Sequence, residues 1–258
     1  MSHHTLLRWF LFGLVVGLLV LGAENGAWAD PIYYTTQVGE DVVFDSIRED
    51  SATDPTPLYG PPTVSANSLV FFPVSFKAYA SEMHPAVDLT DGTMSMTIRS
   101  LQGGPILGIL VRESGDFTLG GLGTANTIAA VATPMFVTIT QVDGQSITPI
   151  SFSQSMTYSP KANGKFNLLD DEGVGETWEG LALLDVAGAL AAAGIQGAAT
   201  KVTLSLDNVL LATSEAASVA YIAKKQFGIE VLIPEPSTLT LLILACVGFL
   251  ARGRRRFK

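Results

Sequence analysis

Short runs of β-branched and aromatic residues, each bounded by turn-forming residues, constrain the fold of this 258-residue chain more than any other feature. Residues 93–98 read TMSMTI and residues 202–207 read VTLSLD, so apolar and polar side chains alternate. A period of two places the apolar side chains on one face of a strand. Strands with one apolar and one polar face predict a mainly β fold, and specifically an antiparallel, jelly-roll-like β-sandwich. Strands are expected over residues 32–36, 42–46, 68–80, 93–100, 106–113, 135–142, 147–158, 201–213 and 218–231.

One segment departs from this pattern. Residues 181–193 (LALLDVAGALAAA) are rich in Ala and Leu and are followed by Gly194. This composition with a glycine stop predicts one short helix beside the sandwich. Because no repeat, charged run or linker interrupts residues 30–233, we expect them to form one domain.

The composition excludes several classes of protein. With 48% apolar and 15% charged residues, the chain is neither a coiled coil nor a highly charged disordered chain. One Cys and three His are too few for a disulfide framework or a zinc cluster. The net charge of -9 would repel phosphate, so nucleic acid is not expected as a partner.

The N-terminus has the layout of a secretory signal peptide. Arg8 precedes an uncharged apolar run over residues 9–22, and Ala27 and Ala29 form an A-x-A site before Asp30. Such a run is too short to span a membrane as a permanent anchor. We therefore expect residues 1–29 to be a signal helix that signal peptidase removes after Ala29.

The C-terminus, residues 234–258, has three parts. The motif Pro-Glu-Pro-Ser (234–237) precedes an uncharged segment over residues 238–251 and a basic tail over residues 252–258. Fourteen helical residues span roughly 21 Å, less than the roughly 30 Å hydrocarbon core, so this helix is a short membrane segment. The basic residues predict a cytoplasmic C-terminus: Arg252, Arg254, Arg255, Arg256 and Lys258.

This tail resembles the PEP-CTERM sorting signal of Gram-negative bacteria. The resemblance implies that an exosortase-type membrane protease recognises Pro234, Glu235 and Pro236 and processes the tail. It also implies export, a transient tether to the inner membrane, and delivery to the outer surface or a polysaccharide matrix. Segments 53–60, 114–119 and 201–231 are further similar to bodies of planctomycete-type PEP-CTERM proteins, which are generally uncharacterised. A plain C-terminal anchor with an incidental Pro-Glu-Pro is the alternative.

The segment between the two ends offers little for catalysis. It contains nine basic and 22 acidic residues, no Cys, and His84 as its one histidine. A Ser-His-acid hydrolase needs a positioned histidine, and no G-x-S-x-G elbow is present. His84 lies in a polar, turn-like stretch typical of a surface loop. We therefore expect the protein not to be an enzyme and to need no cofactor.

One acidic cluster is a candidate calcium site, since oxygen-rich loops bind Ca²⁺ in many exported domains. It does not match the spacing of an EF-hand. Acidic residues before a helix also complement its dipole, and that reading stays open. The candidate ligands are Asp170, Asp171, Glu172 and Glu176, with Glu179 nearby.

Carbohydrate recognition is the second functional hypothesis. A sandwich that binds sugars often presents aromatic rings, and Trp178 lies among polar residues where it could face solvent. The alternative is that Trp178 packs against the helix as part of the core. Phe71 and Phe72 must point to opposite faces of one strand. The sequence thus predicts an exported surface or matrix protein with a structural or adhesive body. The alternative is a body that binds or acts on carbohydrate such as an exopolysaccharide.

Overall fold

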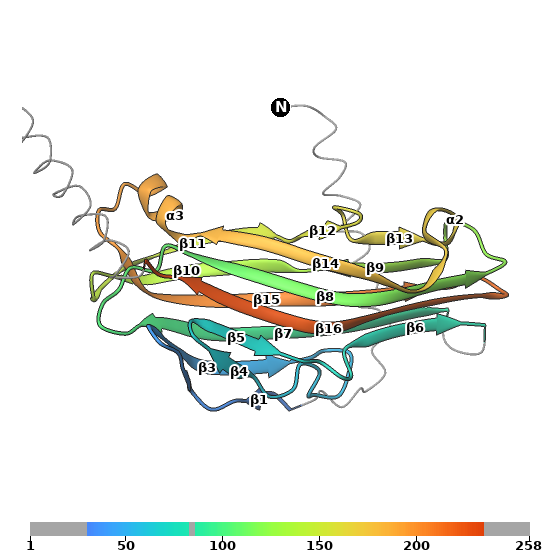
Figure 1. Cartoon of the computed structure of the whole chain (residues 1–258), viewed down its shortest axis with the longest axis horizontal. Coiled ribbons are helices and arrows are strands. Elements are labelled where there is room, and N and C mark those ends of the chain that lie inside the picture. Colours follow the sequence, from blue (N-terminus) through green and yellow to red (C-terminus); the bar gives the residue numbers. More distant parts are fainter. Residues whose placement is uncertain (1–29, 83–85, 235–258) are drawn as a thin grey trace, which may run out of the picture.

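The computed structural model of the protein describes residues 30–82 and 86–234, and these form two packed antiparallel sheets (Figure 1). Sheet A has nine strands in which the main path runs β1-β3-β7-β15-β10-β11. They are β1 (Ile32–Tyr33), β2 (Gln37–Val38), β3 (Val42–Asp50), β7 (Val87–Ser100), β9 (Ile128–Ala132), β10 (Pro134–Val142), β11 (Gln145–Ser155), β13 (Lys165–Asn167) and β15 (Ala199–Thr213).

Sheet B has seven strands, and its main path runs β12-β14-β8-β16-β5-β4, with β6 paired to β16. Its centre is formed by long strands that are far apart in sequence and lie side by side in space (Figure 1). The strands are β4 (Thr63–Ser65), β5 (Ser68–Phe71), β6 (Lys77–Ser81), β8 (Gly108–Gly121), β12 (Thr157–Ser159), β14 (Gly173–Asp185) and β16 (Ser218–Leu232).

The expected alternation builds the core. Met94, Met96 and Ile98 of β7 are buried, as are the matching apolar residues of β15, while the Thr and Ser residues between them face outward. Burying one such side chain contributes about 1.5–3 kcal/mol, so these two strands alone supply much of the driving force for sheet packing. The prediction of a mainly β sandwich is confirmed.

A hairpin shows how local sequence sets the register. Asp143 and Gly144 join β10 to β11, and both have positive φ, 47° and 74°. Two consecutive positive φ values define the type I′ turn, whose twist matches that of the flanking strands. The Asp-Gly pair therefore fixes how the two strands of sheet A pair.

The helix expected over residues 181–193 is wrong in its first part. Residues 181–185 belong to β14, and the helix α3 covers only Val186–Ala192, with Asp185 as its N-cap. Leu181 and Leu183 face outward while Ala182 and Leu184 are buried, so the strand is apolar on both faces and its period is hidden. A second short helix, α2 (Leu168–Asp171), was not expected.

Several predicted features fall outside the described residues. These are the signal segment with Ala27 and Ala29, His84, and the tail beyond Pro234 with its basic residues. Within residues 30–82 and 86–234, no helix is long and apolar enough to cross a membrane.

Candidate functional site

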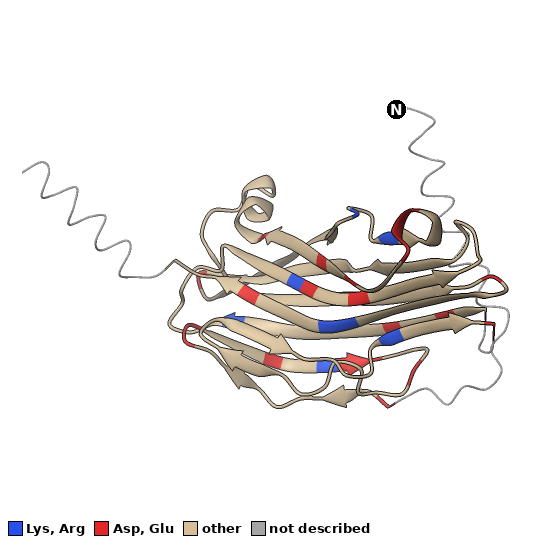
Figure 2. Cartoon of the chain, turned by 45° about the vertical axis from the view of Figure 1, so that its right-hand side comes forward, with Lys and Arg blue, Asp and Glu red and all other residues tan. Residues whose placement is uncertain are grey.

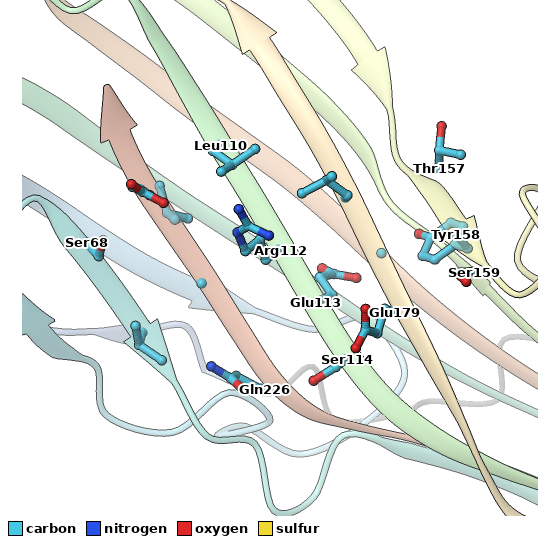
Figure 3. Close-up of a pocket in the computed structure, with 16 residues that line it drawn as sticks. Ser68, Leu110, Arg112, Glu113, Ser114, Thr157, Tyr158, Ser159, Glu179 and Gln226 are labelled. Carbon is cyan, nitrogen blue, oxygen red and sulfur yellow. The ribbon is translucent and has the colours of Figure 1, made fainter. Parts of the chain in front are cut away.

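A pocket of about 580 Å³ lies on the outer face of sheet B. It crosses five neighbouring strands, from β5 through β16, β8 and β14 to β12 (Figure 3). At a strand spacing of roughly 4.8 Å, five strands span roughly 19 Å. The volume lies within the range of about 300–1,000 Å³ typical of ligand sites. The pocket is therefore long enough for an extended ligand rather than a single small group.

Strand alternation explains which side chains line this pocket. On β8, Leu110, Arg112 and Ser114 point outward because Val111 and Glu113 point into the core. The neighbouring strands place further polar groups beside them, as Figure 3 shows for Glu179 on β14 and Gln226 on β16. The other outward polar groups are Ser68, Thr157, Ser159 and Glu230. The wall therefore offers hydroxyl, amide, guanidinium and carboxylate groups over an aliphatic floor.

Arg112 is the one cation of the pocket lining. Its guanidinium forms no ion pair within residues 30–82 and 86–234. Figure 2 shows the basic positions scattered among acidic ones rather than gathered into a patch. With Glu179 and Glu230 nearby, the pocket carries no excess of positive charge, and a neutral ligand suits it better than an anionic one.

Gly228 keeps the middle of the pocket open. A Cβ at this position would meet nothing closer than Val70 Cγ2 at 3.9 Å, so the residue leaves a hollow where a side chain could stand. The hollow is thus a consequence of sequence, since any larger residue on this outward position of β16 would fill it.

The two exposed carboxylates of the pocket stand far apart. Glu179 pairs with Ser114 and Glu230 pairs with Leu110, on opposite sides of β8. Four residues along a strand and two strand spacings give a separation of roughly 16 Å. Glycoside hydrolases place their two carboxyl groups about 5–10 Å apart. These two carboxylates therefore lack the spacing of a glycoside hydrolase pair, and Glu113, the third carboxylate of the lining, is paired with Lys224 in the interior.

The aromatic residues considered from the sequence lie elsewhere. Trp178 is only 1% exposed and packs edge-to-face against Tyr158, so the reading in which it faces solvent is wrong. Phe71 is buried and Phe72 is exposed, which confirms their opposite orientations. Tyr79 and Tyr221 form an aromatic pair in sheet B, on β6 and β16, beyond the end of the pocket.

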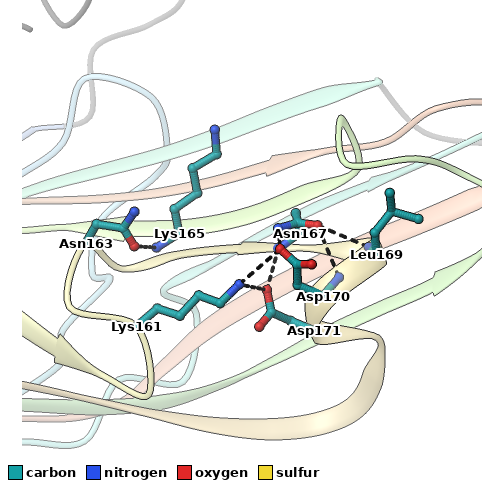
Figure 4. Close-up of polar contacts among 7 residues, drawn as sticks. All are labelled: Lys161, Asn163, Lys165, Asn167, Leu169, Asp170 and Asp171. Carbon is teal, nitrogen blue, oxygen red and sulfur yellow. Dashed lines mark hydrogen bonds and ion pairs between the residues drawn. The ribbon is translucent and has the colours of Figure 1, made fainter.

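The acidic cluster proposed for calcium is divided between two elements. Asp170 and Asp171 belong to α2, where Lys161 Nζ lies 3.6 Å and 2.6 Å from their carboxylates (Figure 4). Asn167 caps the helix and donates from its side chain to Asp170, which together with Lys161 lowers the pKa of that carboxyl. Glu172 ends the helix, and Glu176 and Glu179 lie on β14 instead of in the expected loop. No group of three or more His, Cys, Asp or Glu in the described part of the chain could hold a metal ion, and calcium binding stays a prediction.

The carboxyl group of Asp91, on β7 of sheet A, titrates abnormally. The pKa of Asp91 is raised to about 7, chiefly by partial burial and also by a hydrogen bond with Asp207 and by the charge of Asp207. One buried carboxylate oxygen of Asp91, Oδ1, accepts no hydrogen bond from the described residues. The neighbouring carboxylate disfavours the charged form of Asp91, so Asp91 retains a proton at pH values where a free aspartate has lost it.

Because the folded pKa of Asp91 lies above its unfolded value, the folded protein binds more protons between about pH 4 and pH 7. The contribution of Asp91 to stability therefore falls as the pH rises through that window. Asp91→Asn is expected to flatten the decline, measured as the thermal midpoint at a series of pH values. Glu172→Gln, an exposed substitution, is the control, and equal pH slopes in Asp91→Asn and the wild type would refute the assignment.

Sequence reasoning did not find the pocket. Its polar residues alternate with core residues on β8, β14 and β16. The polar faces of β8 and β16 were therefore predictable, since strands are expected over residues 106–113 and 218–231. Their meeting depends on the order β14-β8-β16, which brings together segments more than a hundred residues apart. No motif in the chain signals that order.

Comparison with known proteins gives no family. No family model matches the chain, and no curated protein matches it. Solved structures with partial similarity include the carbohydrate-binding module TmCBM61 in complex with β-1,4-galactotriose, at 8% identity over 65% of this chain and 70% of that chain, with a TM-score of 0.21. The family 11 xylanase of Neocallimastix patriciarum shares 9% identity over 79% of this chain and 99% of its own, with a TM-score of 0.20. TM-scores this low establish no common function.

Proposed function

We propose that this protein is an exported surface or matrix protein whose body binds an extended, neutral polysaccharide chain without cleaving it. The observation that carries the proposal is the open pocket across sheet B, with polar groups along its walls. Sugars present hydroxyl groups that both donate and accept hydrogen bonds. Gln226, Arg112 and the Ser and Thr hydroxyls of the pocket are suited to pair with them.

Charge supports a neutral ligand. The segment between the two terminal signals contains 22 acidic and nine basic residues, so an acidic polymer would meet repulsion at long range. The wide spacing of Glu179 and Glu230 supports binding of the polysaccharide rather than its hydrolysis. The body would then act as an adhesive unit between the cell surface and the matrix.

Binding can be tested by affinity electrophoresis of the full chain in gels containing polysaccharide purified from the producing cells. We expect retarded migration with neutral polysaccharide and no retardation with a uronic-acid polymer at the same concentration. Migration that is unchanged with every polysaccharide would reject the binding function. Release of reducing ends on incubation would show instead that the protein cleaves its ligand.

Export rests on the sequence of the two ends. We propose that signal peptidase and an exosortase-type protease process them and direct the body to the outer surface or matrix. The test compares the wild type with Glu235→Ala and with a chain lacking residues 234–258. Both variants are expected to fail to reach the outer surface or matrix, and unchanged localisation of either would remove the sorting proposal. This result is independent of whether the pocket binds polysaccharide.

A further inference from the structure

A buried polar network occupies the space between the two sheets. Lys224 of β16 and Glu113 of β8 enter it from sheet B, and Asn208 of β15 enters it from sheet A. The side chains of Lys224 and Glu113 are fully buried, and Asn208 is also inaccessible. Lysine and glutamate are almost never buried to this extent unless they are paired. Lys224 Nζ lies 2.7 Å from Glu113 Oε1 and directly against the side-chain carbonyl oxygen of Asn208.

Lys224 points inward in phase with Ala220 and Ile222 of β16, and an irregularity follows it. The pairing of β16 with β8 shifts register between Lys224 and Gln226, so Lys225 and Gln226 both face solvent. Lys225 forms an exposed ion pair with Asp116 at 3.5 Å, whereas Lys224 points into the core. Of these two adjacent lysines, only Lys224 is therefore buried in the interior.

The surroundings of Lys224 disfavour its charge. Its Nζ lies 5.0 Å from the centre of the Phe76 ring and 5.8 Å from those of Tyr59 and Phe227. Burial lowers the pKa of Lys224 to about 8, although Glu113 acts in the opposite direction. A fraction of Lys224 therefore carries the neutral amine, which is the nucleophilic form, near neutral pH.

The carboxamide of Asn208 is held in place on both sides. Its Nδ2 donates to the Tyr59 hydroxyl at 2.7 Å, and that hydroxyl donates to the carbonyl oxygen of Gly92 at 2.8 Å. The Thr133 hydroxyl lies 2.8 Å from Asn208 Oδ1 and 3.0 Å from Glu113 Oε2, and it can donate to either. Donation to Oδ1 would stabilise negative charge that develops on that oxygen.

We propose that Lys224 and Asn208 react with each other and form an intramolecular amide cross-link between the two sheets. This inference is independent of polysaccharide binding. Nucleophile, carbonyl and proton carrier are all in contact, and a fixed geometry of this kind replaces a slow bimolecular reaction by an intramolecular one.

Each step of the reaction balances without an external oxidant or cofactor. Glu113 first takes a proton from the Lys224 ammonium, and the resulting amine attacks Cγ of Asn208. The tetrahedral oxyanion is held by the Thr133 hydroxyl. The attacking nitrogen then gives up a proton, which Glu113 relays to Nδ2, and the bond from Cγ to Nδ2 breaks. The products are the new amide and one molecule of ammonia, with Glu113 left protonated.

The position of the bond gives it a mechanical role. β15 and β16 are joined by the short segment 214–217 and lie in opposite sheets, so the cross-link would tie the sandwich through its interior. The chain has a single Cys, Cys246, which lies in the C-terminal segment, so a disulfide cannot serve this purpose in the body. An amide also resists the reducing agents that open disulfides.

Peptide mapping of the full chain, denatured before digestion, tests the proposal. Asn208 and Lys224 both lie between the tryptic sites at Lys201 and Lys225. The cross-link is expected to block cleavage after Lys224 and to give the peptide 202–225 with about 17 Da missing, the mass of one ammonia. Further cleavage after Glu215 should leave its two fragments joined. An unmodified 202–224 peptide as the main product in the wild type would overturn the proposal.

Variants separate the cross-link from other losses of ammonia. Lys224→Arg and the isosteric Glu113→Gln are expected to give peptides of full mass that separate on cleavage after Glu215. Lys225→Arg, at the adjacent exposed lysine, should leave the cross-link in place. Succinimide formation at Asn208 removes the same mass but does not require Lys224. Persistence of the loss in Lys224→Arg would therefore contradict the proposal, even if Glu113→Gln failed to fold.

Discussion

Gly115→Ala is expected to destabilise the body by more than about 3 kcal/mol, or to prevent its folding. Gly115 of β8 lies under the ring of Trp178, the residue opposite it on β14. A Cβ at this position would stand 1.9 Å from the carbonyl oxygen of Ala223 and 2.7 Å from two atoms of the indole ring. Neither neighbour can move easily, because one is backbone in the middle of sheet B and the other is a fully buried side chain.

Urea denaturation followed by circular dichroism measures this effect as the free energy of unfolding. Gly120→Ala is the matched control, since Gly120 lies on the same strand and its Cβ would meet only Val219 at 3.8 Å. The control is expected to change stability by less than about 0.5 kcal/mol. Equal stability of Gly115→Ala and Gly120→Ala would mean that Trp178 does not pack on β8 as described.

Glu49→Ala is expected to lower the free energy of unfolding by roughly 3–5 kcal/mol, since a buried donor left without a partner costs about 1–3 kcal/mol. Glu49 is fully buried on β3 and accepts hydrogen bonds from three groups. The backbone N–H groups of Leu58 and Tyr59 donate to Oε1, and the Tyr34 hydroxyl donates to Oε2 at 2.5 Å. All three donors would lose their acceptor.

The loss should extend beyond the loop before β4. Tyr59 packs its ring against Phe76 and Phe227, which also surround Lys224. Glu40→Ala, at an exposed glutamate of the same N-terminal region, is the control. Its free energy of unfolding should equal that of the wild type. A Glu49→Ala variant with wild-type stability would show that the loop is held by its apolar contacts alone.

Strand periodicity predicted most of the sandwich, and its failures have physical causes. Residues 202–207 alternate cleanly because their outward face is polar, so their strand was predictable. Residues 181–184 of β14 carry Leu on the outward face and Leu or Ala on the inward face, which resembles a buried helix. The segment predicted as one strand over residues 68–80 is two, β5 and β6.

The interior network was less predictable than the fold. Lys224 and Lys225 form a charged pair, and such a pair is typical of a solvated surface. Lys224 lies inward in phase with Ala220 and Ile222, and the register shift after it leaves Lys225 and Gln226 both outward. Glu113 and Asn208 lie in different sheets, so their meeting follows from sheet packing and from no local pattern. The pocket could not be predicted for the same reason, since it depends on the order of strands in sheet B.

The most direct test of polysaccharide binding in the sheet B pocket is a titration with one neutral polysaccharide that retards the wild type. Gly228→Ile would fill the hollow at the centre of the pocket, where a Cβ has open space and β-branched residues suit a strand. Gly120→Ile adds the same side chain to the outer face of β8 outside the pocket. We expect Gly228→Ile to weaken binding at least tenfold, about 1.4 kcal/mol, and Gly120→Ile to bind as the wild type does. Unchanged affinity in a folded Gly228→Ile variant would contradict binding in this pocket.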